Sequence, residues 1–199
     1  METISQTLDT IIALMRLNAP LVLGLITVLV LIHIVNWLLG YRLNYLGIYP
    51  RHLLGIPGIL FSPLLHGNFN HLFFNAIPLY MLASFILFYG LPYFIYVTLI
   101  IVVLSGTAVW LIGRKALHIG ASSLILGYWS YLLINAYNHP SISSVILGIV
   151  TLYYFAGMAL NLLPTDARSS WEGHICGFLA GIAANYLAPM LVQYTIVLN

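Results

Sequence analysis

The 199-residue chain has a composition that water-soluble domains do not show. It is 62% hydrophobic and only 5% charged, whereas soluble domains average about a quarter charged residues. Six Lys or Arg and four Asp or Glu are too few to form a basic surface, which argues against nucleic acid as a partner. The single cysteine, Cys176, excludes an intramolecular disulfide and multi-cysteine metal or redox motifs. We expect an all-α membrane protein, embedded in the lipid bilayer, that needs no cofactor and no metal.

Apolar runs of membrane-spanning length divide the chain into six predicted transmembrane helices. Residues 20–39 are as long as a full span, so we interpret them as a retained helix rather than a signal peptide. The predicted domain organisation is an N-terminal extramembrane segment at 1–19 and a six-helix domain at 20–199. The predicted helices cover residues 20–39, 71–89, 91–112, 122–138, 143–163 and 173–196.

The fourth predicted helix is short. Residues 122–138 extend only about 25 Å at about 1.5 Å per residue, which is less than the roughly 30 Å of hydrocarbon in a bilayer. If Asn138-His139-Pro140 marks one membrane surface, Ser122 lies below the other surface, at the start of a short central helix.

Chain parity places three polar residues at one depth. The connections 40–65, 113–121 and 164–172 all emerge on one membrane face, and the second, fourth and sixth helices begin there. His71, Ser122 and His174 lie in the first turns of these helices. Because polar groups inside a bilayer are costly unless they are paired, we expect this layer to be functional.

The residue types in this layer suit nucleophilic catalysis. Gly120 breaks the chain just before Ser122, which would expose the hydroxyl beside helix N–H groups that lack intrahelical partners. His174 could accept the Ser122 proton, because an alcohol needs a positioned base to become a nucleophile. His71 and Asn75 are four residues apart on one helix face and could donate hydrogen bonds to an oxyanion.

Neighbouring residues support this interpretation. Glu172 lies two residues from His174 and would point in another direction, so we expect a Ser–His dyad rather than a triad. His66 precedes the second helix and is a possible site-adjacent residue. Small residues should let the fourth and sixth helices approach closely: Gly127 on the fourth, and Gly173, Gly177 and Gly181 at every fourth position of the sixth.

Three sequence stretches resemble the signatures of rhomboid proteases, in the right order and on the expected helices. They are His66-Gly-Asn-Phe-Asn-His71-Leu-Phe-Phe-Asn75, Gly120-Ala-Ser122, and His174-Ile-Cys-Gly177-Phe-Leu-Ala-Gly181. The resemblance implies a rhomboid-like bundle of six transmembrane helices and an intramembrane serine endopeptidase that cuts other membrane proteins in or near their transmembrane segments. It implies that Ser122 is the nucleophile and His174 the base. His71, Asn75 and the Ser122 N–H would form the oxyanion hole, and residues 164–172 would cap the site.

The sequence departs from the rhomboid pattern at three points. Leu126 stands where many members have an aromatic ring near the catalytic histidine, and Ser123 stands where glycine is usual. A Trp-Arg pair that often precedes the first histidine is absent, with Pro57-Gly58 in that neighbourhood. These differences concern ring stacking, loop anchoring and substrate preference, and they leave the dyad in place.

Other interpretations remain open. A chain that keeps the rhomboid fold but lacks catalytic activity would be an inactive rhomboid-like protein that binds membrane clients. Haem ligation by His71 and His174 would leave the Gly120 turn without a role. A zinc protease would need a His-Glu-x-x-His helix, which the chain lacks. We interpret the remaining histidines as interfacial or as lone residues with satisfied hydrogen bonds: His33, His52, His118 and His139.

The expected location is the inner membrane of a bacterium, with several passes. Five of the six basic residues lie on the predicted active-site face, which favours a cytoplasmic site under the positive-inside rule. They are Arg42, Arg51, Arg114, Lys115 and Arg168. The rhomboid resemblance implies the opposite, a site open to the periplasm or exterior, and we follow the resemblance.

Overall fold

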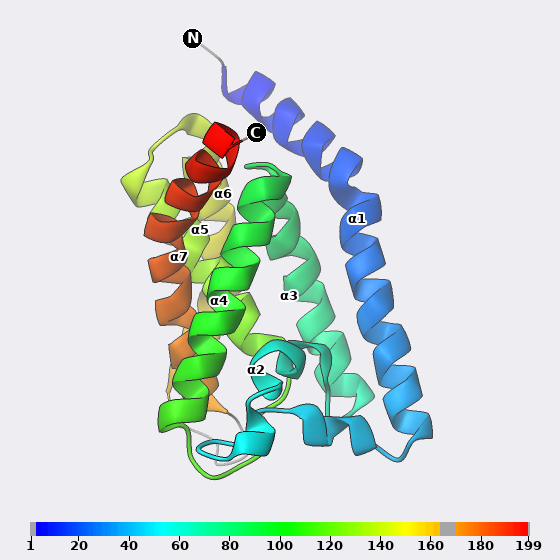
Figure 1. Ribbon diagram of the computed structural model, residues 1–199. Coiled ribbons are helices and arrows are strands. Elements are labelled where there is room, and N and C mark those ends of the chain that lie inside the picture. The colour runs from blue at the N-terminus through cyan, green and yellow to red at the C-terminus, as the bar shows by residue number, and fades with distance from the viewer. Residues whose placement is uncertain (1–2, 164–169, 199) are drawn as a thin grey trace.

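The computed structural model describes residues 3–163 and 170–198, and its elements are helices of the α and 3-10 types. Figure 1 shows long helices packed side by side, with both chain ends at one end of the bundle and the short helical turns at the other. In chain order the elements are α1 (Ile4–Leu38), η1 (Arg42–Leu46), η2 (Leu53–Gly55), α2 (Gly58–Phe61), η3 (Ser62–Leu64), α3 (Phe69–Leu87), α4 (Leu91–Ile112), α5 (Ser122–Asn138), α6 (Ile142–Phe155), η4 (Ala156–Leu162) and α7 (Trp171–Leu198).

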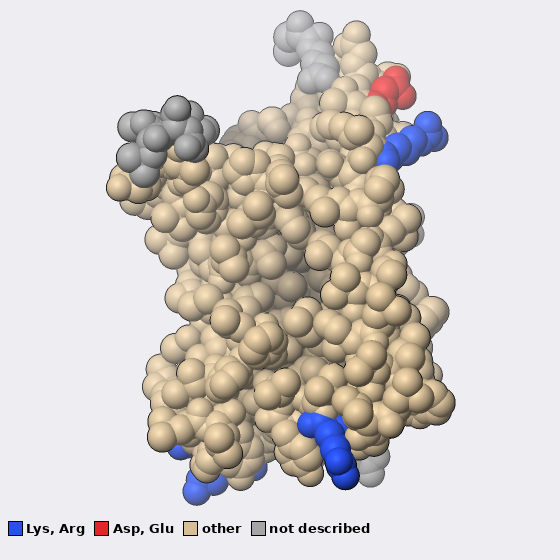
Figure 2. Space-filling view, turned by 45° about the vertical axis from the view of Figure 1, so that its right-hand side comes forward, with Lys and Arg blue, Asp and Glu red and all other residues tan. Residues whose placement is uncertain are grey.

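Five helices in the described part of the chain are long and apolar enough to cross a membrane. These are Ile4–Leu38, Phe69–Leu87, Leu91–Ile112, Ile142–Leu162 and Trp171–Thr195. The remaining long helix, α5, has the bounds predicted from the sequence but only 17 residues. Six full spans therefore stay a prediction, whereas a multi-pass helical membrane protein is confirmed. Figure 2 agrees, because a broad uncharged belt separates the charged side chains at its two ends.

The first helix begins earlier than predicted. α1 starts at Ile4, because Thr3 and Gln6 form a capping box in which each side chain bonds the other residue's backbone. The helix then runs through Pro20. Proline removes one backbone donor, and this long helix continues past it. The location of residues 1–19 outside the bilayer stays a prediction.

The fifth predicted helix ends differently. Its α-helical part, α6, stops at Phe155, and the chain continues as the 3-10 helix η4 to Leu162. The tighter winding of η4 changes which backbone carbonyls are free to accept other hydrogen bonds. One of these carbonyls belongs to Asn161 and faces α7.

The short helix α5 forms the centre of the bundle. All nine residues from 124 to 132 are buried, which is expected only for a helix covered on every side. It packs against α3, α4, α6 and α7. Ser122 at its first position therefore starts inside the protein rather than at a lipid-facing edge.

Candidate active site

Ser122 and His174 lie beside each other at the N-terminal ends of α5 and α7. The Ser122 Oγ is 3.0 Å from the His174 Nε2, within hydrogen-bond reach. The small-residue stripe makes this approach possible, because a Cβ added at Gly177 would overlap the Ser123 backbone and one at Gly181 would overlap that of Gly127. The packing role of these glycines stays a prediction, and these close contacts are what it requires.

A backbone carbonyl determines which nitrogen of His174 carries the proton. The His174 Nδ1 lies 2.8 Å from the carbonyl oxygen of Asn161, which can only accept a hydrogen bond. In the neutral ring, Nδ1 is therefore the donor and Nε2 is free to accept the Ser122 hydroxyl proton. This tautomer is the one that a general base requires.

Glycine is required at the turn before Ser122. Gly120 has φ +116°, a backbone conformation that other residues rarely adopt. A Cβ at this position would also lie 2.8 Å from the Cε1 and Nε2 atoms of His71. The turn and the His71 ring are thus in direct contact, and the first N–H groups of α5 emerge next to that ring.

Asn75 offers an unused donor in the same layer. It is only 8% exposed, and its Nδ2 has no hydrogen-bond partner among the described residues. Buried amides are normally paired, so an unpaired one suggests that its partner arrives with a ligand. Asn75 lines a cavity of about 710 Å³, and so do His71, Ser122 and His174.

His66 packs against His71 beside this layer. Its ring is fully buried and lies 5.1 Å from the ring of His71, centroid to centroid. Burial, together with the neighbouring His71 and His33, lowers the pKa of His66 to about 3. His66 is therefore neutral at pH 7 and packs against the edge of the site.

The four remaining histidines separate into two pairs. His52 and His139 are exposed, as expected for interfacial residues. His118 is buried with both ring nitrogens bonded, to Ser170 and to the Arg114 carbonyl. The prediction of an interfacial or hydrogen-bonded histidine is wrong for His33, which is buried in contact with Phe69 and whose ring nitrogens bond no described residue.

The described residues contain no cluster of three His, Cys, Asp or Glu that could hold a metal ion.

Comparison with known proteins identifies the family. The sequence matches the Rhomboid domain over residues 54–190. The chain belongs to the rhomboid family. This family includes serine proteases.

This rhomboid is also similar to mycobacterial proteins. It is 36% identical over 175 residues to an uncharacterized protein of Mycobacterium tuberculosis, covering 83% of this chain and 73% of that protein. An uncharacterized protein of Mycobacterium leprae is 34% identical over 175 residues, covering 83% of this chain and 69% of that protein.

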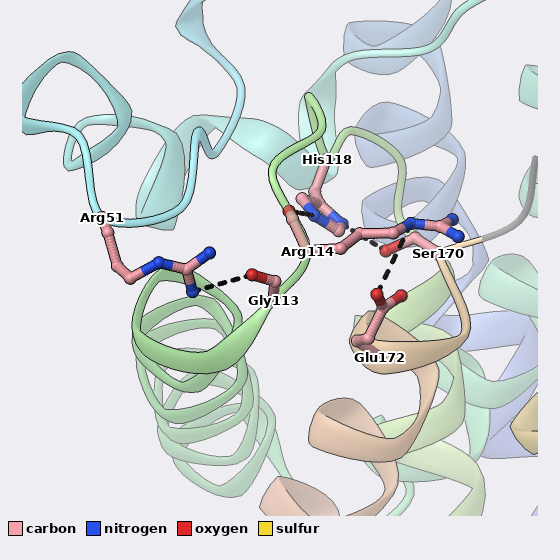
Figure 3. A network of polar contacts seen from close by, with 6 residues as sticks. All are labelled: Arg51, Gly113, Arg114, His118, Ser170 and Glu172. Atoms are coloured by element: carbon pink, nitrogen blue, oxygen red, sulfur yellow. Dashed lines mark hydrogen bonds and ion pairs between the residues drawn. The ribbon is translucent and has the colours of Figure 1, made fainter.

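The rhomboid anchors its first connection without the Trp-Arg pair of the family pattern. The Arg51 Nη1 donates to the carbonyl of Leu111 at 3.0 Å and to that of Gly113 at 2.9 Å, and so caps the end of α4. Figure 3 shows the bond to Gly113. The Trp110 indole donates to the carbonyl of His52 at 3.0 Å. A tryptophan and an arginine from different segments therefore hold this loop.

Sequence reasoning missed some residues at this rhomboid site. Asn161 acts through its backbone carbonyl, which leaves no signal in the residue type. Serine is a common residue in loops, so Ser170 gives no signal in the sequence. Its contact with His118 depends on how two connections fold. Of the predicted cap at 164–172, residues 164–169 lie outside the described residues. Leu126 is buried and lines the cavity, where many members have an aromatic ring.

Proposed function

We propose that this rhomboid is an intramembrane serine endopeptidase with Ser122 as nucleophile and His174 as general base. The observation that carries this proposal is the hydrogen-bonded chain from Ser122 Oγ to His174 Nε2 and from His174 Nδ1 to the Asn161 carbonyl. A serine paired with a base that a third group orients is the arrangement of nucleophilic catalysis.

The proposed reaction has two steps. In the first, the Ser122 Oγ attacks the scissile carbonyl carbon while its proton moves to the His174 Nε2. The C–N bond then breaks, and His174 returns the proton to the leaving amine, which leaves an acyl ester on Ser122. In the second step, His174 takes a proton from water and the water oxygen bonds to the acyl carbon. The ester bond to Ser122 then breaks, and His174 returns the proton to the Ser122 Oγ.

The negative charge on the carbonyl oxygen needs donors. We propose that the Ser122 N–H at the start of α5, the Asn75 amide and the His71 ring are these donors, since all three residues line the same cavity. Donors placed where charge develops lower the barrier most when water is excluded. The burial of Asn75 and His174 supports this role.

The lining of the cavity and the family membership support a proposal for the substrate class. Apolar side chains form much of its lining, including Phe74 and Ile77 of α3 and Phe155 of α6. Phe74 is 71% exposed and so faces the lipid. We propose that a substrate's transmembrane segment unwinds beside these residues and presents an extended peptide to Ser122, because a helix hides its carbonyls.

Labelling with a serine-reactive fluorophosphonate tests the nucleophile. We expect the probe to modify the purified wild-type protein at Ser122 and to leave Ser122→Ala unmodified. Ser5→Ala is the matched control, because Ser5 is exposed on α1 near the opposite end of the bundle, and it should label like the wild type. A folded wild type that does not label would favour a catalytically inactive, client-binding rhomboid.

The proposed location is a bacterial inner membrane with the site open to the periplasm or exterior. The two chain ends lie at the bundle end opposite the site (Figure 1), so a reporter after Asn199 reads the side that the site does not face. A reporter active only in the cytoplasm should be active there. Activity of a periplasmic reporter instead would reverse the orientation, as the positive-inside rule favours.

A further inference from the structure

Two hydrogen bonds join the same two chain segments with the same spacing. Ser122 bonds His174, and four residues earlier on both segments His118 bonds Ser170. Both pairs are separated by 52 residues in the sequence. The pair His118 and Ser170 therefore lies four residues before the pair Ser122 and His174 on both segments, in the connections that lead into α5 and α7.

The His118 ring is held in one orientation by two partners. Its Nε2 lies 3.1 Å from the carbonyl oxygen of Arg114, so Nε2 is the donor in the neutral ring. Its Nδ1 then accepts the hydroxyl proton of Ser170, at 2.5 Å. Figure 3 shows the ring lying between these two groups.

Ser170 is connected to His174 by a second bond. The His174 backbone N–H donates to the Ser170 carbonyl at 3.1 Å, which closes the first turn of α7. An ion pair joins the same segments, with the Arg114 Nε 3.5 Å from a Glu172 oxygen. The Arg114 side chain is partly exposed, so this pair adds less than the buried hydrogen bond.

The other side of the contact is anchored independently of α7. The His118 N–H and carbonyl both bond Ile48, at 2.9 and 3.0 Å, and the Gly120 N–H bonds the Ser62 carbonyl at 2.9 Å. The segment that leads to Ser122 is thus fixed to the first connection of the chain. A bond from His118 to Ser170 transfers this fixed position to the start of α7.

We propose that His118 and Ser170 are positioning residues that align His174 with Ser122. Neither side chain contacts the reacting atoms; they hold the first turn of α7 in the register that sets the 3.0 Å distance between base and nucleophile. This inference rests on the proposed function. Its physical basis is that a misplacement of about 1 Å at a reacting group can lower a rate about 100-fold.

Steady-state cleavage of a transmembrane substrate in liposomes is the first test. We expect Ser170→Ala and His118→Leu each to lower kcat about 10- to 100-fold with KM unchanged. The double variant should be no slower than the slower single variant, because both changes remove one bond. Ser170→Thr keeps the hydroxyl, and His118→Gln keeps a donor and an acceptor, so both should recover most of kcat. Wild-type kcat in both removal variants, or losses that add, would overturn the inference.

Nitrogen-15 NMR of the imidazole rings is the second test and needs no activity. We expect the His174 ring, assigned by its absence in His174→Gln, to be a single Nδ1–H tautomer in the wild type. Ser170→Ala should give a tautomer mixture, because a displaced first turn of α7 would weaken the bond from Nδ1 to the Asn161 carbonyl. An unchanged single tautomer would overturn the positioning role. Failure of the proposed function looks different: wild type would not cleave or label at Ser122, while the NMR result would still decide whether Ser170 orients His174.

Discussion

The Nδ1 atom of His174 lies 2.8 Å from the carbonyl oxygen of Asn161, so a backbone group occupies the place that an acid takes in a serine protease triad. A neutral carbonyl orients the ring but stabilises an imidazolium less than a carboxylate does. The nearby Glu172 points instead to Arg114. Within residues 3–163 and 170–198, the base is thus oriented by a backbone carbonyl and not by a third ionised residue.

A dyad predicts that Glu172, the carboxylate nearest the base among the described residues, is dispensable for chemistry. We expect Glu172→Gln to keep kcat within about threefold of the wild type, because the Glu172 carboxylate pairs with Arg114 and makes no hydrogen bond to His174 in the described structure. In a triad the same change would lower kcat about 10⁴-fold, which steady-state cleavage would reveal.

The unpaired amide of Asn75 should matter for activity and not for folding. Asn75→Leu removes a buried donor that has no partner among the described residues, so we expect an unchanged or higher unfolding temperature. Loss of an oxyanion donor should lower kcat about 100- to 1,000-fold. A parallel loss of thermal stability and activity would instead indicate a packing role for Asn75.

The contact between α5 and α7 should not tolerate a methyl group. Gly177→Ala would drive a Cβ into the Ser123 backbone, and we expect a loss of about 1–3 kcal/mol in the free energy of unfolding together with lower activity. Gly24→Ala on α1 is the matched control, because nothing lies within 4 Å of the added atom. That control should gain about 0.5–1 kcal/mol, since alanine favours a helix interior over glycine. Equal effects in the two variants would argue against the close contact.

His66 should make the fold sensitive to acid. Its folded pKa of about 3 lies below the reference value of 6.5, so between these values the unfolded chain binds more protons and stability falls as the pH falls. From pH 7 to pH 5 this group should remove roughly 2 kcal/mol from the free energy of unfolding. His66→Phe should flatten the dependence of the unfolding temperature on pH, whereas His139→Gln, an exposed control, should not. Parallel curves for His66→Phe and wild type would contradict this assignment.

Much of the site's placement was predictable because membrane topology restricts where residues can meet. Alternate helices start on one face, so Ser122 and His174 had to share a depth despite their separation in sequence. The extra helical turns before Pro20 were missed because apolar length, rather than the Thr3 cap, set the predicted start. The Asn161 carbonyl and the bond between His118 and Ser170 were also missed. Both depend on how connecting segments fold, and hydrophobic runs carry no information about that.

The most direct test of the account is cleavage of a model transmembrane substrate in liposomes by the wild type, Ser122→Ala and His174→Ala. The account predicts that the wild type cuts the substrate and that both variants lose cleavage while keeping the wild-type unfolding temperature. Cleavage that persists in folded Ser122→Ala would contradict the assignment of Ser122 as the nucleophile.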